Sequence, residues 1–287
     1  MSSEKERGKA DSMYAEYWKI RESPFRSGSD PGYFFRSATH HAALLKLRYL
    51  VESRKGAGLL AGESGAGKSL LTGMLEEELP EGGGPIVRLF YPQMSSLEFL
   101  SWLAIELGAS ESDLHLPGQR VDLVVRAIEG RLIELGRQER HPVIVVDDAH
   151  VIEDLKVYQS MRLLLNLLDR TDVDFSLILV GEPPLLARMQ RTGALNDRLG
   201  VRALIRAFSP EEVAQYVVHR LTYAGCERPL FNDVALEALF ERSGGIPRRI
   251  NQLCDMALLV GYANRASVIS AREIEGVAEE LGTALAE

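Results

Sequence analysis

The chain has 287 residues, of which 46% are hydrophobic and 26% are charged, a composition typical of a globular protein with one large or two medium domains. Its formal net charge of -8 disfavours a protein that binds nucleic acid through clustered Lys and Arg. No apolar run approaches the ~20 residues of a membrane span, and the charged start of the chain is no signal peptide. We therefore expect a cytoplasmic protein with no membrane span.

The amino-terminal part of the chain divides into a polar tail and an aromatic segment. Residues 1–12 are polar and show no periodicity, which predicts a disordered tail. The following aromatic residues are set between turn residues, which predicts an ordered but irregular segment packed on a core. They include Tyr14, Tyr17, Trp18, Phe25, Tyr33, Phe34 and Phe35. Contact with an adenine ring is the alternative to packing, because a phosphate-binding motif follows closely.

A helix is expected next, over residues 38–53. Its inward side chains are expected to be Ala42, Leu45, Tyr49 and Leu50. The chain then enters a short apolar run, residues 58–61, which reads as a buried strand.

The central motif follows that strand and matches the phosphate-binding pattern G-x-x-x-x-G-K-[ST]. It reads Gly62-Glu63-Ser64-Gly65-Ala66-Gly67-Lys68-Ser69. A helical pattern then places Leu70, Leu71, Met74, Leu75 and Leu79 on one side. Strand, loop and helix in this order are the context that the motif requires.

Each residue type in the motif has a physical reason. The three glycines let the backbone bend and approach a phosphate closely, so that successive N–H groups and the helix N-terminus form an anion-binding nest. We expect residues 62–70, through Leu70, to bind the nucleotide. Lys68 is expected to contact the β- and γ-phosphates of ATP, and Ser69 to place its hydroxyl on Mg2+.

The middle of the chain alternates strands and helices. The apolar run at 86–91 predicts a strand, and the capping box of Ser95 and Glu98 opens a helix that runs to Gly108. A loop at 109–118 and a helix at 119–138 follow. Such alternation is typical of an α/β fold with a parallel sheet.

The second informative stretch is Val143-Ile144-Val145-Val146-Asp147-Asp148-Ala149-His150. A continuous apolar run predicts a strand buried on both faces. Carboxylates at its end, downstream of a phosphate loop, match a Walker B arrangement. Asp147 is then expected to hold the Mg2+ shell, and Asp148 to activate the attacking water.

The remaining segments complete the sheet and begin a helical region. A leucine-rich helix is expected at 154–169, a strand at 174–180, a short helix after Pro183 and a last strand at 203–208. From Ser209 onward the pattern is wholly helical. Capping boxes at Ser209 and Ser270, a cap at Asn232 and a start near Ile246 mark about four helices. The expected domains are residues 13–208, the α/β core, and 209–287, a helical lid.

This order of motifs resembles an AAA+ ATPase, and more narrowly the ExeA/GspA type found in general secretion and MSHA-type pilus operons. The chain is also similar, more distantly, to MuB/TniB transposition helpers and Orc/Cdc6 initiators. The most specific stretch is Gly245-Ile246-Pro247-Arg248-Arg249-Ile250-Asn251-Gln252-Leu253-Cys254. The resemblance covers about residues 14 to 282 and implies a P-loop core with a parallel five-stranded sheet between helices, followed by an all-helical lid.

The resemblance also implies catalytic roles for further residues. Arg248 matches the sensor-2 arginine, which contacts the γ-phosphate within its own subunit. Arg198 matches an arginine finger that acts on the neighbouring subunit's nucleotide, and Arg202 is the alternative. A finger supplied in trans requires an oligomer, so a nucleotide-dependent homo-oligomer, ring or filament, is expected. Glu182 occupies the sensor-1 position.

The chain departs from the family pattern at two of these positions. The family usually has Asp-Glu where this chain has Asp147-Asp148, and glutamine where it has Glu182. The shorter Asp148 sets its carboxylate back by about 1.5 Å, and an ionised Glu182 cannot donate a hydrogen bond. These changes predict slow hydrolysis, or a water held partly by His150, but not a loss of nucleotide binding. The membrane span and peptidoglycan-binding domain of longer secretion ATPases are not expected in this sequence.

The sequence as a whole predicts an enzyme that hydrolyses ATP with Mg2+ to drive conformational work on a partner. The resemblance favours a protein partner from secretion or envelope assembly. A DNA-associated ATPase of the transposition-helper type is the less favoured alternative, and a slow nucleotide-dependent switch is another.

Overall fold

The computed structural model describes residues 14–26, 28, 30–80, 84–110 and 120–283. The tail expected over 1–12 and most of the loop expected over 109–118 lie outside this part. The chain forms two compact units. We call residues 38–62 and 71–205 the sheet unit, and the described residues within 14–37, 63–70 and 206–283 the lid unit. Each is described by itself.

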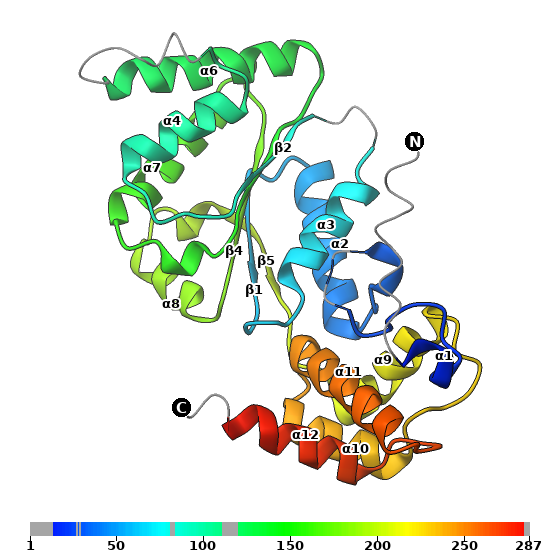
Figure 1. Ribbon diagram of the computed structural model, residues 1–287. Coiled ribbons are helices and arrows are strands. Elements are labelled where there is room, and N and C mark those ends of the chain that lie inside the picture. The colour runs from blue at the N-terminus through cyan, green and yellow to red at the C-terminus, as the bar shows by residue number, and fades with distance from the viewer. Residues whose placement is uncertain (1–13, 27, 29, 81–83, 111–119, 284–287) are drawn as a thin grey trace. The chain divides into compact units, whose positions relative to one another are not determined.

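The sheet unit is built on five parallel strands in the order β2-β3-β4-β1-β5 (Figure 1). The strands are β1 (Ala57–Ala61), β2 (Ile86–Leu89), β3 (Val143–Val146), β4 (Ser176–Gly181) and β5 (Leu199–Leu204). All residues of β1, β3 and β4 are buried, as expected for parallel strands covered on both faces. The five strands confirm the expected fold class.

Register fixes which residues meet at the carboxyl edge of this sheet. Ala61 of β1 lies opposite Gly181 of β4, and Val146 of β3 lies opposite Leu179 of β4. Residues that follow β1, β3 and β4 therefore emerge from the same edge, with neighbouring strands about 4.8 Å apart.

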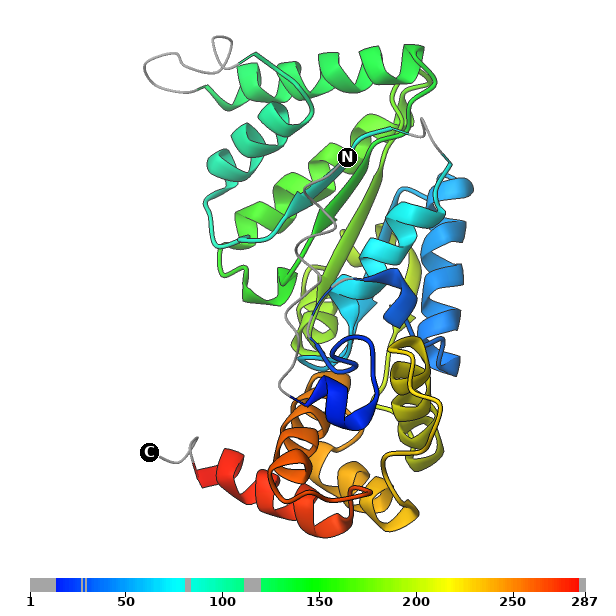
Figure 2. The same ribbon diagram turned by 45° about the vertical axis from the view of Figure 1, so that its right-hand side comes forward.

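Helices cover both faces of the sheet. One face carries α2 (Ala38–Glu52) and the part of α3 (Lys68–Glu78) beyond Leu70, and the other carries α4, α6, α7 and α8 (Figures 1 and 2). The latter four are Ser96–Glu106, Val121–Arg137, Leu155–Leu165 and Pro184–Arg191. The expected capping box of Ser95 and Glu98 opens α4, and Asp154 caps α7. Three short 3-10 turns, η2 (Ala149–Val151), η3 (Asn166–Asp169) and η4 (Asn196–Arg198), complete the unit.

Two sequence predictions were wrong in this unit. The last strand occupies Leu199–Leu204 rather than 203–208, because its alternation of buried and exposed residues is that of an edge strand rather than a continuous apolar run. In α2, three side chains expected to face inward, Ala42, Leu45 and Tyr49, are exposed, whereas Leu50 is buried as expected, together with Leu44 and Leu47. The exposed set and the buried set both recur with a helical period. Packing on the sheet decides which of the two faces inward.

The lid unit joins helices from both ends of the chain. Its helices are α1 (Ala15–Trp18), η1 (Pro31–Tyr33), α9 (Pro210–Tyr223), α10 (Asp233–Ser243), α11 (Pro247–Ala263) and α12 (Ala271–Thr283). The predicted starts are confirmed, because Ser209 and Glu212 form a full capping box, Asn232 caps α10, and Glu273 accepts from the backbone N–H of Ser270. The aromatic segment packs into one core with these helices.

Trp18 is the centre of that packing. Its side chain is fully buried, and its indole N–H donates to the carbonyl of Leu258 in α11 at 2.9 Å. Tyr14, Phe25 and Tyr33 are buried as well. Simple packing therefore accounts for these four aromatic rings. The domain boundary expected at residue 208 stays a prediction, and by contact the aromatic segment groups with the helices that follow residue 205.

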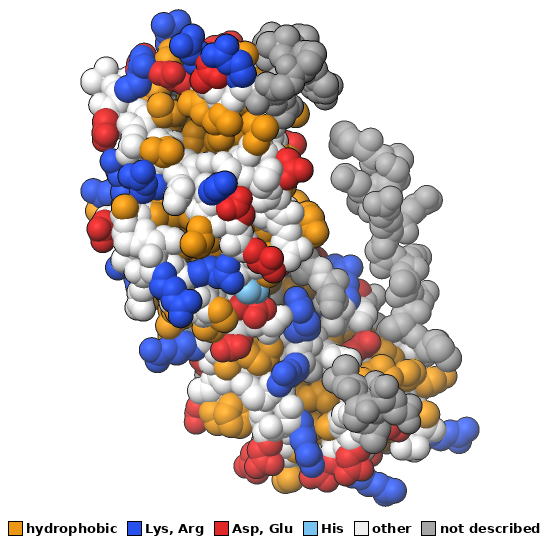
Figure 3. All heavy atoms as spheres, turned by 90° about the vertical axis from the view of Figure 1, so that its left-hand side faces the viewer, with side chains coloured by type: hydrophobic (Ala, Val, Ile, Leu, Met, Phe, Trp, Pro, Cys, Tyr) orange, Lys and Arg blue, Asp and Glu red, His pale blue; other side chains and the backbone are white. Residues whose placement is uncertain are grey.

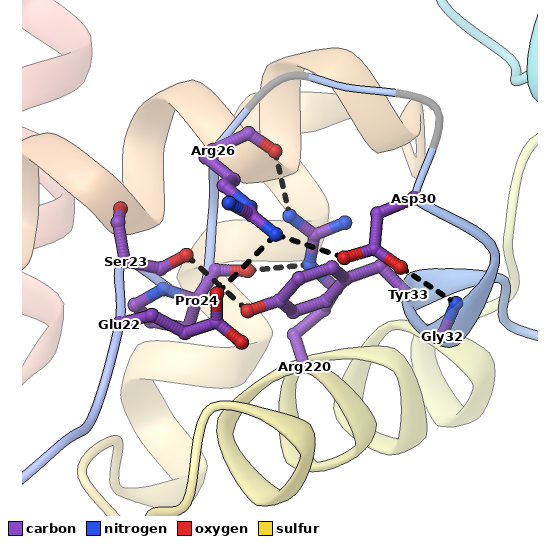
Figure 4. A network of polar contacts seen from close by, with 8 residues as sticks. All are labelled: Glu22, Ser23, Pro24, Arg26, Asp30, Gly32, Tyr33 and Arg220. Atoms are coloured by element: carbon purple, nitrogen blue, oxygen red, sulfur yellow. Dashed lines mark hydrogen bonds and ion pairs between the residues drawn. The ribbon is translucent and has the colours of Figure 1, made fainter. Parts of the chain in front are cut away.

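A buried arginine ties the aromatic segment to α9 (Figure 4). The Arg220 guanidinium donates to the carbonyls of Pro24 at 2.5 Å and Arg26 at 2.8 Å, and lies 4.1 Å from the centroid of the Tyr33 ring. Burial lowers the pKa of Arg220 and raises that of Tyr33. The neutral ring and the two carbonyls thus solvate the cation in place of water.

Arg220→Ala is expected to lower the free energy of unfolding by about 2–3 kcal/mol, because it removes two charge-assisted hydrogen bonds and leaves two buried carbonyls unpaired. Urea denaturation followed by circular dichroism measures the change. Arg228→Ala is the control, since the exposed Arg228 donates to a single carbonyl, that of Ser267, at 3.2 Å. Equal losses in the two variants would contradict the role given to Arg220.

Candidate nucleotide-binding site

The phosphate-binding motif begins where β1 ends. The N–H of Gly62 donates to the carbonyl of Gly181 at 3.1 Å, which fixes the start of the motif to the end of β4 within the sheet unit. The motif thus leaves the sheet at the carboxyl edge. This is the edge at which open α/β sheets bind ligands.

The loop itself belongs to the lid unit and has the geometry of an anion-binding turn. Gly65 and Gly67 have φ values of 75° and 100°, which favour glycine. Ala66 donates to the carbonyl of Glu63 at 3.1 Å, and α3 begins at Lys68. The Lys68 amine is buried and donates to the Glu63 carbonyl at 3.0 Å, so its position is tied to the loop backbone. The Ser69 residue is exposed.

Arg248 lies against this loop within the lid unit. Its backbone N–H donates to the Gly65 carbonyl at 3.2 Å, and a Cβ atom built on Gly65 would lie 2.7 Å from the Arg248 Cβ. The sequence separates the two residues by 183 positions, yet the fold brings the first turn of α11 onto the phosphate loop. Arg248 is exposed, which leaves its guanidinium accessible to a ligand of the loop.

The two aspartates after β3 lie at the carboxyl edge of the sheet unit. Asp147 is 9% exposed, and its N–H donates to the Leu89 carbonyl of β2 at 2.9 Å. Its Oδ1 accepts from the N–H of Asp148 at 3.0 Å. Asp148 adopts a left-handed φ of 46°, a conformation that costs a non-glycine residue about 1–2 kcal/mol and that clusters at functional sites. Its side chain is 55% exposed.

The structure brings His150 between Asp148 and Glu182. His150 Nδ1 lies 3.8 Å from Asp148 Oδ1, and Nε2 lies 3.8 Å from Glu182 Oε2. The N–H of Glu182 points at the His150 ring, with 3.3 Å to Nδ1. Three of the residues singled out in the sequence therefore form one cluster at the ends of β3 and β4.

Two further side chains hold the His150 turn, and no sequence motif marks either of them. The Tyr158 hydroxyl donates to the Ala149 carbonyl, and Arg188 of α8 donates to the Ile152 carbonyl. Burial raises the pKa of Tyr158 to about 12, so the hydroxyl keeps its proton at neutral pH. In the sequence, a tyrosine within a leucine-rich helix is expected to be a core residue. Only the tertiary fold brings its hydroxyl to the Ala149 carbonyl.

Each of the two units contains an oxygen donor of a kind that suits Mg2+. This ion prefers one or two carboxylate or hydroxyl oxygens from protein, with the remaining positions taken by phosphates and water. In the sheet unit, Asp147 supplies a carboxylate whose Oδ1 accepts from the backbone N–H of Asp148. In the lid unit, Ser69 supplies a hydroxyl on an exposed residue at the start of α3.

The two candidate finger arginines lie near β5, and each contacts its own chain. Arg198 donates to the Leu165 carbonyl at 3.0 Å and lies 3.8 Å from Asp169. Arg202 donates to both the backbone carbonyl and the side-chain Oδ1 of Asn196 at 3.0 Å. Both residues are exposed. The choice between them stays a prediction.

Comparison with known proteins finds a family model and a curated relative that resemble this chain. A profile described as an AAA domain matches residues 51–189. General secretion pathway protein A of Aeromonas hydrophila is 30% identical over 281 residues, covering 93% of this chain and 50% of that protein. The chain therefore spans about half the length of this curated relative.

Solved structures agree on the fold. The Aeropyrum pernix ORC2 protein, determined as ADPNP-ADP complexes, has a TM-score of 0.63 at 15% identity, covering 90% of this chain and 71% of that one. Cdc6p from Pyrobaculum aerophilum has a TM-score of 0.67 at 15% identity, covering 88% and 71%. The resemblance read from the sequence is confirmed. This chain has the AAA+ fold and is similar along 93% of its length to general secretion pathway protein A.

Proposed function

We propose that this chain binds ATP with Mg2+ and hydrolyses the β–γ phosphoanhydride. One observation carries the proposal: Lys68 follows β1 and Asp147 follows β3, and both strands end at the same edge of one sheet with only β4 between them. A phosphate-binding amine and a metal-binding carboxylate are the two groups that nucleotide hydrolysis needs first. The AAA domain and the nucleotide complexes of the ORC2 relative support the same assignment.

The residues take the following roles in the proposal. Backbone N–H groups of the loop, with Lys68, bind the β- and γ-phosphates, while Ser69 and Asp147 hold Mg2+. Asp148 accepts a proton from water as the water oxygen bonds to the γ-phosphorus and the bond to the bridging oxygen breaks, releasing ADP and phosphate. Arg248, which is hydrogen-bonded to the loop through its backbone, senses the γ-phosphate.

We propose that ATP hydrolysis drives conformational work on a protein partner. Similarity to general secretion pathway protein A favours a component of secretion or envelope assembly on the cytoplasmic side. None of the helices in the described ranges is long and apolar enough to cross a membrane. On the face shown in Figure 3, Lys and Arg side chains lie among Asp and Glu side chains, which keeps DNA the less favoured partner.

The first experiment is steady-state ATP hydrolysis across a range of protein concentrations. Arg198, with Arg202 as the alternative, is proposed to act on the nucleotide of a neighbouring subunit. Turnover per subunit is therefore expected to rise with concentration and to fall in Arg198→Ala, while ATP binding is unchanged. If the protein bound ATP but did not hydrolyse it at any concentration, the proposed hydrolase function would be wrong. A nucleotide-dependent switch would then be the favoured function.

Asp148→Glu is expected to raise kcat by about tenfold. The added methylene moves the carboxylate forward by about one bond length, and misplacement of about 1 Å can cost up to a hundredfold in rate. The same change at the neighbouring position, Asp147→Glu, is the matched control. It should slow hydrolysis, because Asp147 is only 9% exposed and a longer side chain would shift the carboxylate that is proposed to hold Mg2+. If Asp148→Glu were no faster than wild type, the short side chain of Asp148 would not be what slows hydrolysis.

A further inference from the structure

The carboxyl edge of β3 and β4 holds an excess of hydrogen-bond acceptors. Asp147, Asp148 and Glu182 all follow these two strands, and an ionised carboxylate can only accept. Phosphate oxygens of a nucleotide are acceptors as well. Under the proposed function, a Glu182 carboxylate that turned toward a bound γ-phosphate would repel it and would compete with it for Mg2+. A donor directed at Glu182 would remove both problems.

The His150 ring has the orientation of such a donor. The Glu182 N–H donates to Nδ1 at 3.3 Å, so Nδ1 carries the lone pair and the proton of the neutral ring lies on Nε2. Nε2 faces Glu182 Oε2 at 3.8 Å. This separation is longer than a direct hydrogen bond, and a small rotation of the glutamate side chain would bring it to hydrogen-bond distance. The backbone N–H of Glu182 is therefore bonded to one ring nitrogen of His150, and the carboxylate of the same residue lies near the other.

The ring cannot turn away easily. His150 is only 16% exposed, and a Cβ atom built on Gly181 would lie 3.2 Å from both its backbone nitrogen and its Nδ1. The turn that carries it is held on one side by Tyr158, through the Ala149 carbonyl, and on the other by Arg188, through the Ile152 carbonyl. The fold thus holds the backbone turn that carries His150, and the ring itself lies close against Gly181.

We propose that His150 is a positioning residue for hydrolysis, whose Nε2–H restrains the Glu182 carboxylate. The restraint keeps Glu182 from the phosphates and leaves Asp148 as the carboxylate that receives the water proton. Asp148 Oδ1 lies 3.8 Å from Nδ1. Because Nδ1 accepts from the Glu182 N–H, it has no proton to donate to Asp148. This inference rests on the proposed ATPase function.

Two isosteric substitutions separate the two ring nitrogens. The amide of His150→Asn lies near the position of Nδ1 and can still accept from the Glu182 N–H, but it offers nothing near Nε2. The amide of His150→Gln reaches the position of Nε2 and can donate there. We expect kcat to fall by about tenfold to a hundredfold in His150→Asn and by less than about threefold in His150→Gln, with the ADP dissociation constant within twofold of wild type in both.

The decisive comparison uses a Glu182→Gln background. The neutral amide needs no restraint, so His150→Asn should cost less than about threefold there. Hydrolysis is measured by phosphate release and binding with a fluorescent ADP, and thermal unfolding checks that each variant folds. Equal kcat losses in the two backgrounds, or a His150→Asn chain as fast as wild type, would overturn the inference alone. A wild-type chain that binds ATP without turnover would instead overturn the proposed function, and this inference with it.

Discussion

Lys68→Ala is expected to reduce ATP hydrolysis by at least about a hundredfold, the loss typical of removing one preorganised donor from a site of developing charge. The Lys68 side chain is buried against the loop, and its amine already donates to the Glu63 carbonyl at 3.0 Å. Alanine removes the only part of this side chain that can contact a phosphate. Steady-state phosphate release at saturating ATP measures the effect.

The control for this variant is Lys156→Ala. Lys156 is an exposed residue in the first turn of α7, and its backbone N–H donates to the capping carboxylate of Asp154 at 2.9 Å. Its side chain has no part in the proposed site. Its removal should leave kcat within twofold of wild type. If Lys68→Ala retained more than a tenth of wild-type turnover, the proposed phosphate-binding role of this lysine would be untenable.

Gly245→Ala is expected to destabilise the lid unit by about 4 kcal/mol or more, in the range reached only by severe steric or polar defects. Gly245 has a φ of 73°, and an added Cβ would lie 2.2 Å from the backbone carbonyl oxygen of Phe208. The same glycine accepts from the Phe208 N–H at 2.9 Å and donates to the Ser243 hydroxyl at 3.1 Å. The overlap is with backbone, so no side-chain rotation relieves it.

The adjacent Gly244 provides a matched control. It also has a positive φ, 61°, but an added Cβ would meet no heavy atom within 4 Å. Gly244→Ala should therefore cost only the backbone strain of the left-handed conformation, about 1–2 kcal/mol. Urea denaturation of the two variants measures the difference. Similar destabilisation in both would show that the approach of Phe208 is not what requires glycine at position 245.

Local signals in the sequence were sufficient for most elements of the fold. Continuous apolar runs marked β1, β3 and β4, and side-chain caps at Ser95, Ser209 and Asn232 marked helix starts. The errors came where the pattern was ambiguous. The edge strand β5 alternates, and α2 carries leucines on two stripes, of which only contact with the sheet selects one.

Only part of the candidate site was predictable from the sequence. The P-loop residues and the two aspartates follow from motif and strand context, because their chemistry depends on neighbours in sequence. The orientation of His150 does not, since it depends on Glu182, 32 positions away, and on the anchors Tyr158 and Arg188. Likewise the contact of Arg248 with Gly65 joins segments that only the tertiary fold brings together.

The burial of Trp18 and Arg220 has a consequence for how this protein can be recombined. Because the segment around Trp18 shares one core with α9 to α12, the lid is a discontinuous module encoded at both ends of the chain. A chimera that exchanges only the residues after Phe208 with those of a relative would join a foreign α9 to the native carbonyls of Pro24 and Arg26. A functional graft of the lid should therefore transfer the segment around Trp18 together with α9 to α12. The same holds for a natural gene fusion that keeps the lid intact.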